Sequence, residues 1–270
     1  MGDVQPDPAD PPTQPLAVVT LAPPRTPWTF VDVFAGLGVV LLVGTVLSAV
    51  VRLSGLSLGS ASLVVSALPV WIGLLGTTIW ACRRHGTGNL VQDLALRIRP
   101  VDLAIGLGAG LGLRIAIGVW AVICIGLTGR QPESNLQDVL GSNGLGTGGA
   151  LVLNVLAIGL IGPVIEELFF RGLGLRSALA GLLRRGAGEP RMADPRRRAR
   201  LAIGATALVF ALLHVSEVND AVSALVLLPG LFLAGCVLGW LTIRTGRLGP
   251  AVLTHVVFNG VAVAALLAIG

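Results

Sequence analysis

The feature that most constrains the fold is a series of apolar stretches, most of them long enough to cross a lipid bilayer. A membrane helix needs about 20 apolar residues. The stretches lie at 30–51, 59–82, 101–127, about 148–170, 201–216, 221–243 and 249–269. Only 12% of the residues are charged, about half the share in soluble domains, so the chain cannot cover a water-exposed surface. The sequence therefore predicts an all-α, polytopic membrane bundle of about seven transmembrane helices.

The arginines predict how these helices are oriented. All 19 basic residues are Arg, and they gather between spans two and three, in 171–200 and between spans six and seven. Because positive charge favours the cytoplasmic side, we expect a cytoplasmic N-terminus and an external C-terminus. The arginines lie between apolar blocks, so we expect lipid contact and no nucleic acid partner. The Arg-only, Ala-, Gly- and Val-rich composition is typical of a GC-rich genome, which favours the plasma membrane of a prokaryote.

The first 29 residues differ from the rest of the chain. They hold eight of the 16 prolines and a single Arg. Such a segment buries too little apolar area to offset its ordering entropy. We therefore expect a disordered, Pro-rich cytoplasmic tail over 1–29 and a membrane domain over 30–270.

Ionisable side chains inside apolar spans are costly and are candidates for function. Asp32 and Asp102 stand at span ends, where we expect the interface to solvate them, and Arg114 should face a carbonyl or carboxylate inside the bundle. The remaining candidates fall in three clusters, E166-E-L-F-F-R171, F210-A-L-L-H214 and H255-V-V-F-N259.

Helix geometry sorts the candidates. Glu167 and Arg171 are four residues apart, so they share a helix face and can pair. Glu166 is turned about 100° away and lacks that partner. His255 and Asn259 are also four residues apart and can point at one target.

This set suits attack of water on an amide or ester. An unpaired glutamate can act as a general base, His214 could hold the same water, and His255 with Asn259 could bind an oxyanion. Two alternatives remain open, a polar network that only holds helices together and a relay for proton-coupled transport.

A metal is a separate question. If a metal is present, Glu166, His214 and His255 are its candidate ligands, and zinc is the candidate ion. The HExxH spacing typical of many zinc proteases is missing, which favours a metal-free glutamate mechanism.

In their order and spacing, the three clusters resemble the EExxxR, FxxxH and HxxxN motifs of the CPBP family, which includes CAAX prenyl proteases of the Ras-converting type and Abi bacteriocin-processing proteins. The similarity extends from about residue 95 to about residue 265. It implies a helical bundle that encloses a polar cavity and an intramembrane endopeptidase acting on a membrane-associated or lipidated, CAAX-like substrate. Some members of the family are non-catalytic scaffolds or immunity proteins, which is the alternative function.

The resemblance also implies a role for each motif residue. Glu166 would be the base, Glu167 its supporting carboxylate and Arg171 the residue that holds the pair. His214 would help to activate water, and His255 with Asn259 would form the oxyanion site. Glu166 can share a water with His214 only if the fourth helix continues from about 148 to about 183, and we expect this longer helix.

Overall fold

The computed structural model describes residues 28–56, 62–132, 147–183 and 194–269. Most of the expected tail (1–27) and part of the Arg-rich run (184–193) lie outside the described residues. Trp28, at the end of the expected tail, is buried in the core. Thr29 caps the first helix, where its hydroxyl accepts a hydrogen bond from the Val31 amide.

The described residues are mostly helical, with no extended strand among them. Their bounds are α1 Phe30–Ser54, α2 Ser62–His85, α3 Leu90–Asp93, α4 Pro100–Thr128, α6 Gly148–Leu156, η2 Ala157–Ile161, α7 Gly162–Glu167, η3 Leu168–Gly174, α8 Leu175–Leu183, α9 Pro195–Leu213, η4 Val215–Glu217, α10 Ala221–Thr245 and α11 Gly249–Ile269. Within these residues, seven continuous helical segments are long and apolar enough to cross a membrane, which confirms the predicted fold class.

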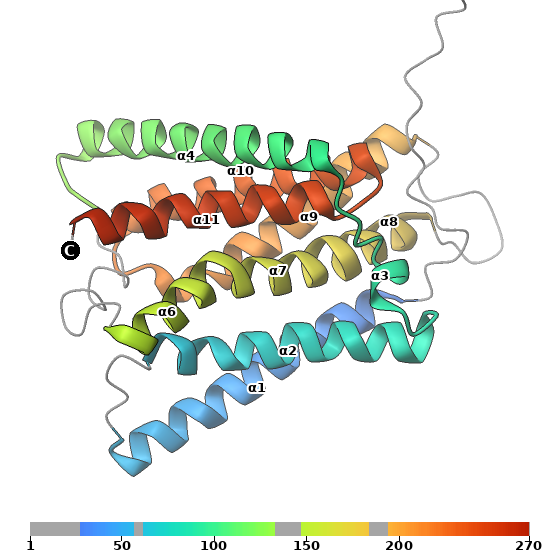
Figure 1. The fold of residues 1–270 in the computed structure, drawn as a ribbon, viewed down its shortest axis with the longest axis horizontal. Helices are drawn as coiled ribbons and strands as arrows, with labels where there is room; N and C mark the ends of the chain where they lie inside the picture. The colour runs from blue at the N-terminus through green and yellow to red at the C-terminus, as the bar shows by residue number, and fades with distance from the viewer. Residues whose placement is uncertain (1–27, 57–61, 133–146, 184–193, 270) are drawn as a thin grey trace, which may run out of the picture.

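The seven spans run alternately in opposite directions along one long axis (Figure 1). The start of α1, the end of α2, α3 and the starts of α4, α9 and α11 lie at one end of the bundle, and the end of α8 lies there too. We call this the arginine-rich end, because the segments at 83–99, 196–200 and 244–247 all belong to it. The start of α6 and the turn between α9 and α10 lie toward the opposite end.

Small residues let the helices approach closely. α4 packs along α11, α9 along α10 and α1 along α2. A Cβ at Gly110 would lie 2.7 Å from the side chain of Val257 and 2.9 Å from the Thr254 carbonyl oxygen. Gly235 lies as tightly against Ala207. Such contacts are typical of helix packing in membranes, where small residues allow backbones to touch.

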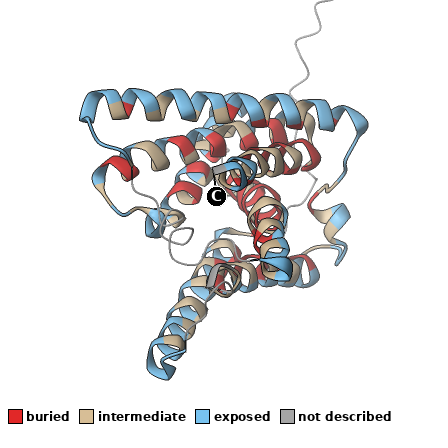
Figure 2. Ribbon diagram, turned by 60° about the vertical axis from the view of Figure 1, so that its left-hand side comes forward, coloured by how far each residue is buried: buried red, intermediate tan, exposed pale blue. Residues whose placement is uncertain are grey.

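Large apolar side chains remain exposed around the outside of the bundle, for example Leu41, Ile115 and Val122. Figure 2 shows that exposed and intermediate positions dominate α1 and the outer face of α4, while buried positions gather where the helices meet. An apolar surface this extensive requires lipid rather than water as its solvent. The chain is thus a multi-pass membrane protein.

The acidic residues at span ends are buried, whereas the sequence suggested that the interface would solvate them. Asp102 is inaccessible and pairs with Arg247. Asp32 accepts a hydrogen bond from the Thr29 amide at 2.6 Å and lies 3.3 Å from Nδ1 of His85. The expectation for Arg114 is confirmed, because its Nε donates to the Phe258 carbonyl at 2.6 Å and its guanidinium lies over that ring.

The fifth span begins earlier than the apolar pattern predicted, at residue 195 instead of 201. Asp194 caps it by accepting a hydrogen bond from the Arg196 amide at 2.8 Å, and Pro195 occupies the first turn, where its missing N–H costs nothing. The arginines at 196–200 therefore extend the helix. The α-helix ends at Leu213 with His214 as its C-cap, and the 3₁₀ turn η4 completes the span to Glu217.

Candidate active site

The first two glutamates of the site lie on the fourth span, which is one continuous helical segment from α6 to α8. Two π-helical segments, η2 and η3, interrupt its α-helical pattern on either side of these glutamates. Pro163 explains the first segment, because it has no N–H to continue the ladder. The Gly162 amide instead bonds the carbonyl of Ala157, five residues earlier, and single π turns of this kind are frequent at functional sites.

The missing N–H also determines what Asn259 contacts. In a π turn the carbonyl of Ile158 would accept from residue 163, which is proline. Asn259 of α11 fills this position, since its Nδ2 donates to the Ile158 carbonyl at 3.0 Å. One N–H of the Asn259 amide is therefore committed to the backbone of η2, and the second N–H remains for another acceptor.

Glu167 and Arg171 form a buried ion pair, as their spacing predicts. Nη1 of Arg171 donates to Oε1 of Glu167 at 2.7 Å, and the two side chains are 1% and 0% exposed. Nη2 of Arg171 donates to the carbonyl of Gly235 on α10 at 3.2 Å. The guanidinium also lies 4.8 Å from the centre of the Phe210 ring. Arg171 therefore ties the fourth span to α9 and α10.

His255 lies between the two glutamates. Its Nδ1 is 2.9 Å from Oε1 of Glu167, and because a carboxylate only accepts, Nδ1 carries the proton. Its Nε2 lies 3.8 Å from Oε2 of Glu166. Glu166 is the more accessible of the two glutamates, with 19% of its side chain exposed.

His214 reaches the same region from α9. Its Nδ1 donates to the carbonyl of Phe210 at 2.8 Å, which leaves Nε2 as the free ring nitrogen. The ring of Phe210 lies 4.8 Å from the His214 ring and 5.8 Å from the His255 ring, measured between centroids. Phe210 is thus the shared wall between the two histidines.

The structure brings four of the six candidates into one connected set, Glu166, Glu167, Arg171 and His255. His214 joins them through Phe210. Asn259 is anchored to η2, one helical turn beyond His255. The spacing in the sequence did not indicate the Glu167–His255 contact, because the two residues are 88 positions apart.

Residues 148–261 match the family model described as type II CAAX prenyl endopeptidase Rce1-like. Over these residues the chain is similar to the Rce1-like endopeptidases. All six candidate residues lie inside the matched region, which begins with α6 and ends within α11. No curated protein and no solved structure matches the chain. The match supports, in general terms, an intramembrane endopeptidase of the CAAX type, which is a hydrolase.

A metal ion would need the candidate ligands of the matched region to lie close together. Among the described residues, no three His, Cys, Asp or Glu side chains lie close enough together to hold one. In both candidate histidines Nδ1 is bonded to an oxygen of the protein, which leaves Nε2 as the nitrogen that could bind a metal. Because Glu166, His214 and His255 do not form a group close enough to hold an ion in the described part of the chain, this set does not fit a metal site, and we derive no step through a metal.

Two residues near the site were not identified as candidates from the sequence. Glu217 interacts electrostatically with both His214 and Glu166. It follows His214 by three positions in the 3₁₀ turn η4, where side chains three apart eclipse, and this spacing was the available signal. Trp71 of α2 is the second, because its Nε1 and Oε1 of Glu166 each lie 4.0 Å from a Cβ built on Gly162.

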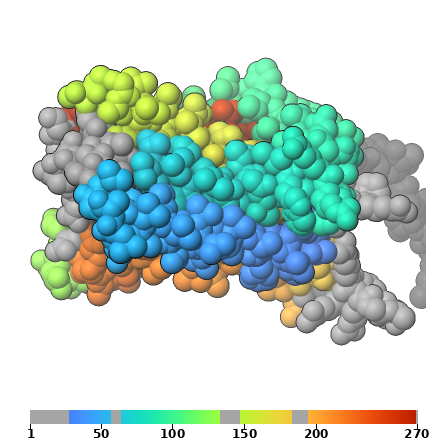
Figure 3. All heavy atoms as spheres, turned by 90° about the horizontal axis from the view of Figure 1, so that it is seen from below, coloured from blue at the N-terminus to red at the C-terminus, as the bar shows by residue number. Residues whose placement is uncertain are grey.

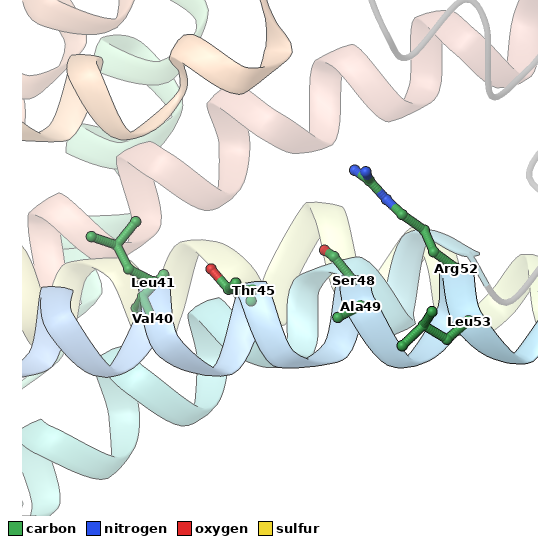
Figure 4. Close-up of a pocket in the computed structure, with 8 residues that line it drawn as sticks. Val40, Leu41, Thr45, Ser48, Ala49, Arg52 and Leu53 are labelled. Atoms are coloured by element: carbon green, nitrogen blue, oxygen red, sulfur yellow. The ribbon is translucent and has the colours of Figure 1, made fainter.

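Two hollows on the protein surface lie away from these residues. A groove of about 650 Å³ follows one face of α1, where the side chains of Thr45, Ser48 and Arg52 project (Figure 4). A second hollow of about 250 Å³ lies between α4 and α10, beside Trp120 and Pro229. Neither is lined by the six candidates, so the polar cavity implied by the family resemblance stays a prediction.

Proposed function

We propose that the protein is an intramembrane endopeptidase that hydrolyses a peptide bond of a membrane-associated or lipidated substrate. The observation that carries the proposal is that the two glutamates differ in burial and in bonding partners. Glu167 is fully buried and bound to both Arg171 and His255. Glu166 has no Arg partner among the described residues, is partly accessible and faces Nε2 of His255.

In the proposed reaction, Glu166 accepts a proton from a water molecule as the water oxygen attacks the scissile carbonyl carbon. The carbonyl oxygen then becomes an oxyanion. When the tetrahedral intermediate collapses, the C–N bond breaks, and the proton held by Glu166 passes to the leaving amine. General base assistance of this kind contributes about 10²–10⁴ in rate.

His214 and Glu166 position the attacking water in this scheme. The free Nε2 of His214 accepts a hydrogen bond from that water, since Nδ1 donates to Phe210. The oxyanion is bound by the second N–H of Asn259 and by Nε2 of His255. Because Nδ1 of His255 already donates to Glu167, donation from Nε2 requires the imidazolium form.

A second function, a non-catalytic membrane scaffold, is favoured by one observation. His214 and Asn259 each bond a backbone carbonyl of the protein, and a network that only holds helices together would do the same. A proton-coupled transporter has no comparable observation in its favour.

The test is a cleavage assay with the purified protein and a library of lipidated and unmodified membrane-anchored peptides, read by mass spectrometry. Glu166→Gln keeps the shape of the side chain and removes the base, so we expect cleavage to fall by about 10²-fold or more. Asp194→Asn is the matched control, because it also removes one carboxylate charge while Asn caps a helix equally well. Normal cellular function of the Glu166→Gln variant would instead favour the scaffold.

A further inference from the structure

The two ends of the bundle differ in how they close over the site. At the arginine-rich end, every residue of the fourth span from Glu167 to Ala178 is buried. Toward the other end, only five residues of 148–166 are buried. The site glutamates stand where this change occurs, because Glu167 is inaccessible and Glu166 is not.

At the arginine-rich end, the turn that follows α3 covers the fourth span. Arg176 donates to the carbonyls of Asp93 and Leu94 at 3.3 and 3.1 Å. The amide of Leu248 donates to Ala95 at 3.1 Å. Leu94 and Leu248 are both fully buried and lie against Gly172, one to two turns beyond the glutamates. Packed and buried side chains therefore lie between Glu166 and the arginine-rich end.

The open end begins at the turn between α9 and α10. Val215, Ser216 and Glu217 of η4 are exposed, and this turn directly follows His214. Glu217 is exposed and lies within electrostatic reach of His214 and Glu166, so this turn lies close to the site. In Figure 1 the turn lies toward the end opposite α3, and in Figure 3 the orange atoms near the α9–α10 turn lie at the left, away from the teal atoms of α2 and α3 at the right.

The distribution of arginine says which compartment each end faces. Segments at the arginine-rich end carry Arg83, Arg84, Arg97 and Arg99, the arginines at 196–200, Arg244 and Arg247. The connections at the other end carry only Arg52 and Arg130. Such asymmetry in short loops sets the orientation of a membrane protein, with the basic side in the cytoplasm.

We infer that the site is reached from the non-cytoplasmic side, and that its substrate is a membrane-anchored peptide whose cleaved bond lies in the outer half of the bilayer or beyond it. The substrate class in this inference rests on the proposed endopeptidase function, whereas the direction of access does not. A lipidated substrate would then be one displayed on the outer leaflet.

Two valines provide a matched pair of probes for the test. Val215 in η4 and Val91 in α3 are 55% and 51% exposed and lie toward opposite ends of the bundle. Each is changed to cysteine in the full-length protein, and intact cells, stripped of any outer membrane, are treated with a membrane-impermeant maleimide. Labelling of the parent protein gives the background from its own cysteines, of which Cys82 and Cys124 are buried and Cys236 is half-buried.

We expect V215C to be labelled in intact cells and V91C to be labelled only after permeabilisation. The reverse pattern, equal labelling of both variants, or no labelling of V215C would each overturn the inference. In the purified protein, a bulky maleimide on V215C should abolish cleavage of the peptide library, and the same group on V91C should leave it unchanged. If the parent protein cleaves no peptide although V215C and V91C are labelled as expected, the proposed function alone is refuted. If the parent protein cleaves peptides but V91C is the variant labelled in intact cells, the direction of access alone is refuted.

Discussion

Removal of the buried guanidinium of Arg171 should destabilise the bundle strongly. Arg171 makes two hydrogen bonds, to Glu167 and to the Gly235 carbonyl, and each bond to a charged group contributes about 1.5–3 kcal/mol. Loss of one partner from a buried ion pair costs about 3–5 kcal/mol, which agrees with that sum. Since a domain has about 5–15 kcal/mol of stability in total, Arg171→Met should lower the unfolding temperature by about 10 °C.

The assay is thermal unfolding of the purified protein in detergent micelles, with Arg197→Met as the control. Arg197 is exposed on the first turn of α9, so its loss should change the unfolding temperature little. The double variant Glu167→Gln/Arg171→Met leaves no unpaired charge of this pair, and we expect it to lose less than the sum of the two single variants. An Arg171→Met protein as stable as the parent, or strictly additive effects, would refute the account of this pair and would give Arg171 a direct role in catalysis.

Three further predictions concern the oxyanion site, the α4–α11 interface and the metal. Asn259→Ala should lower the cleavage rate by about 10²–10³ while substrate affinity changes little, and an unchanged rate would remove Asn259 from the oxyanion site. Gly110→Leu should destabilise the protein, because even a Cβ at this position lies 2.7 Å from the side chain of Val257. The control Gly112→Leu should be tolerated, because nothing lies within 4 Å of a Cβ there. Equal unfolding temperatures for the two variants would contradict the close approach of α4 and α11. Cleavage should survive chelators, and zinc bound in stoichiometric amounts that restores activity would show that the metal-free mechanism is wrong.

Features that depend on neighbours along the chain were predictable from the sequence. The number of spans follows from the length of each apolar run, because the bilayer requires helices of a fixed minimum length. The Glu167–Arg171 pair follows from their four-residue spacing, because such residues share a helix face. The start of the fifth span was missed, because the Asp194–Pro195 cap lies within a run of charges and turn-forming residues that the apolar pattern does not include.

The contacts that would make these residues a catalytic site depend on tertiary structure. His255 meets Glu167 across 88 residues and Asn259 meets Ile158 across 101, and no periodicity in the sequence reports such distances. The π turn at Pro163 creates an acceptor that only a side chain from another helix can satisfy, so Asn259 acquires a backbone partner that its own motif did not suggest. Which end of the bundle is sealed was likewise decided by packing, because Arg176 and Leu248 hold the turn after α3 over Gly172, and this arrangement exists only once the helices are assembled.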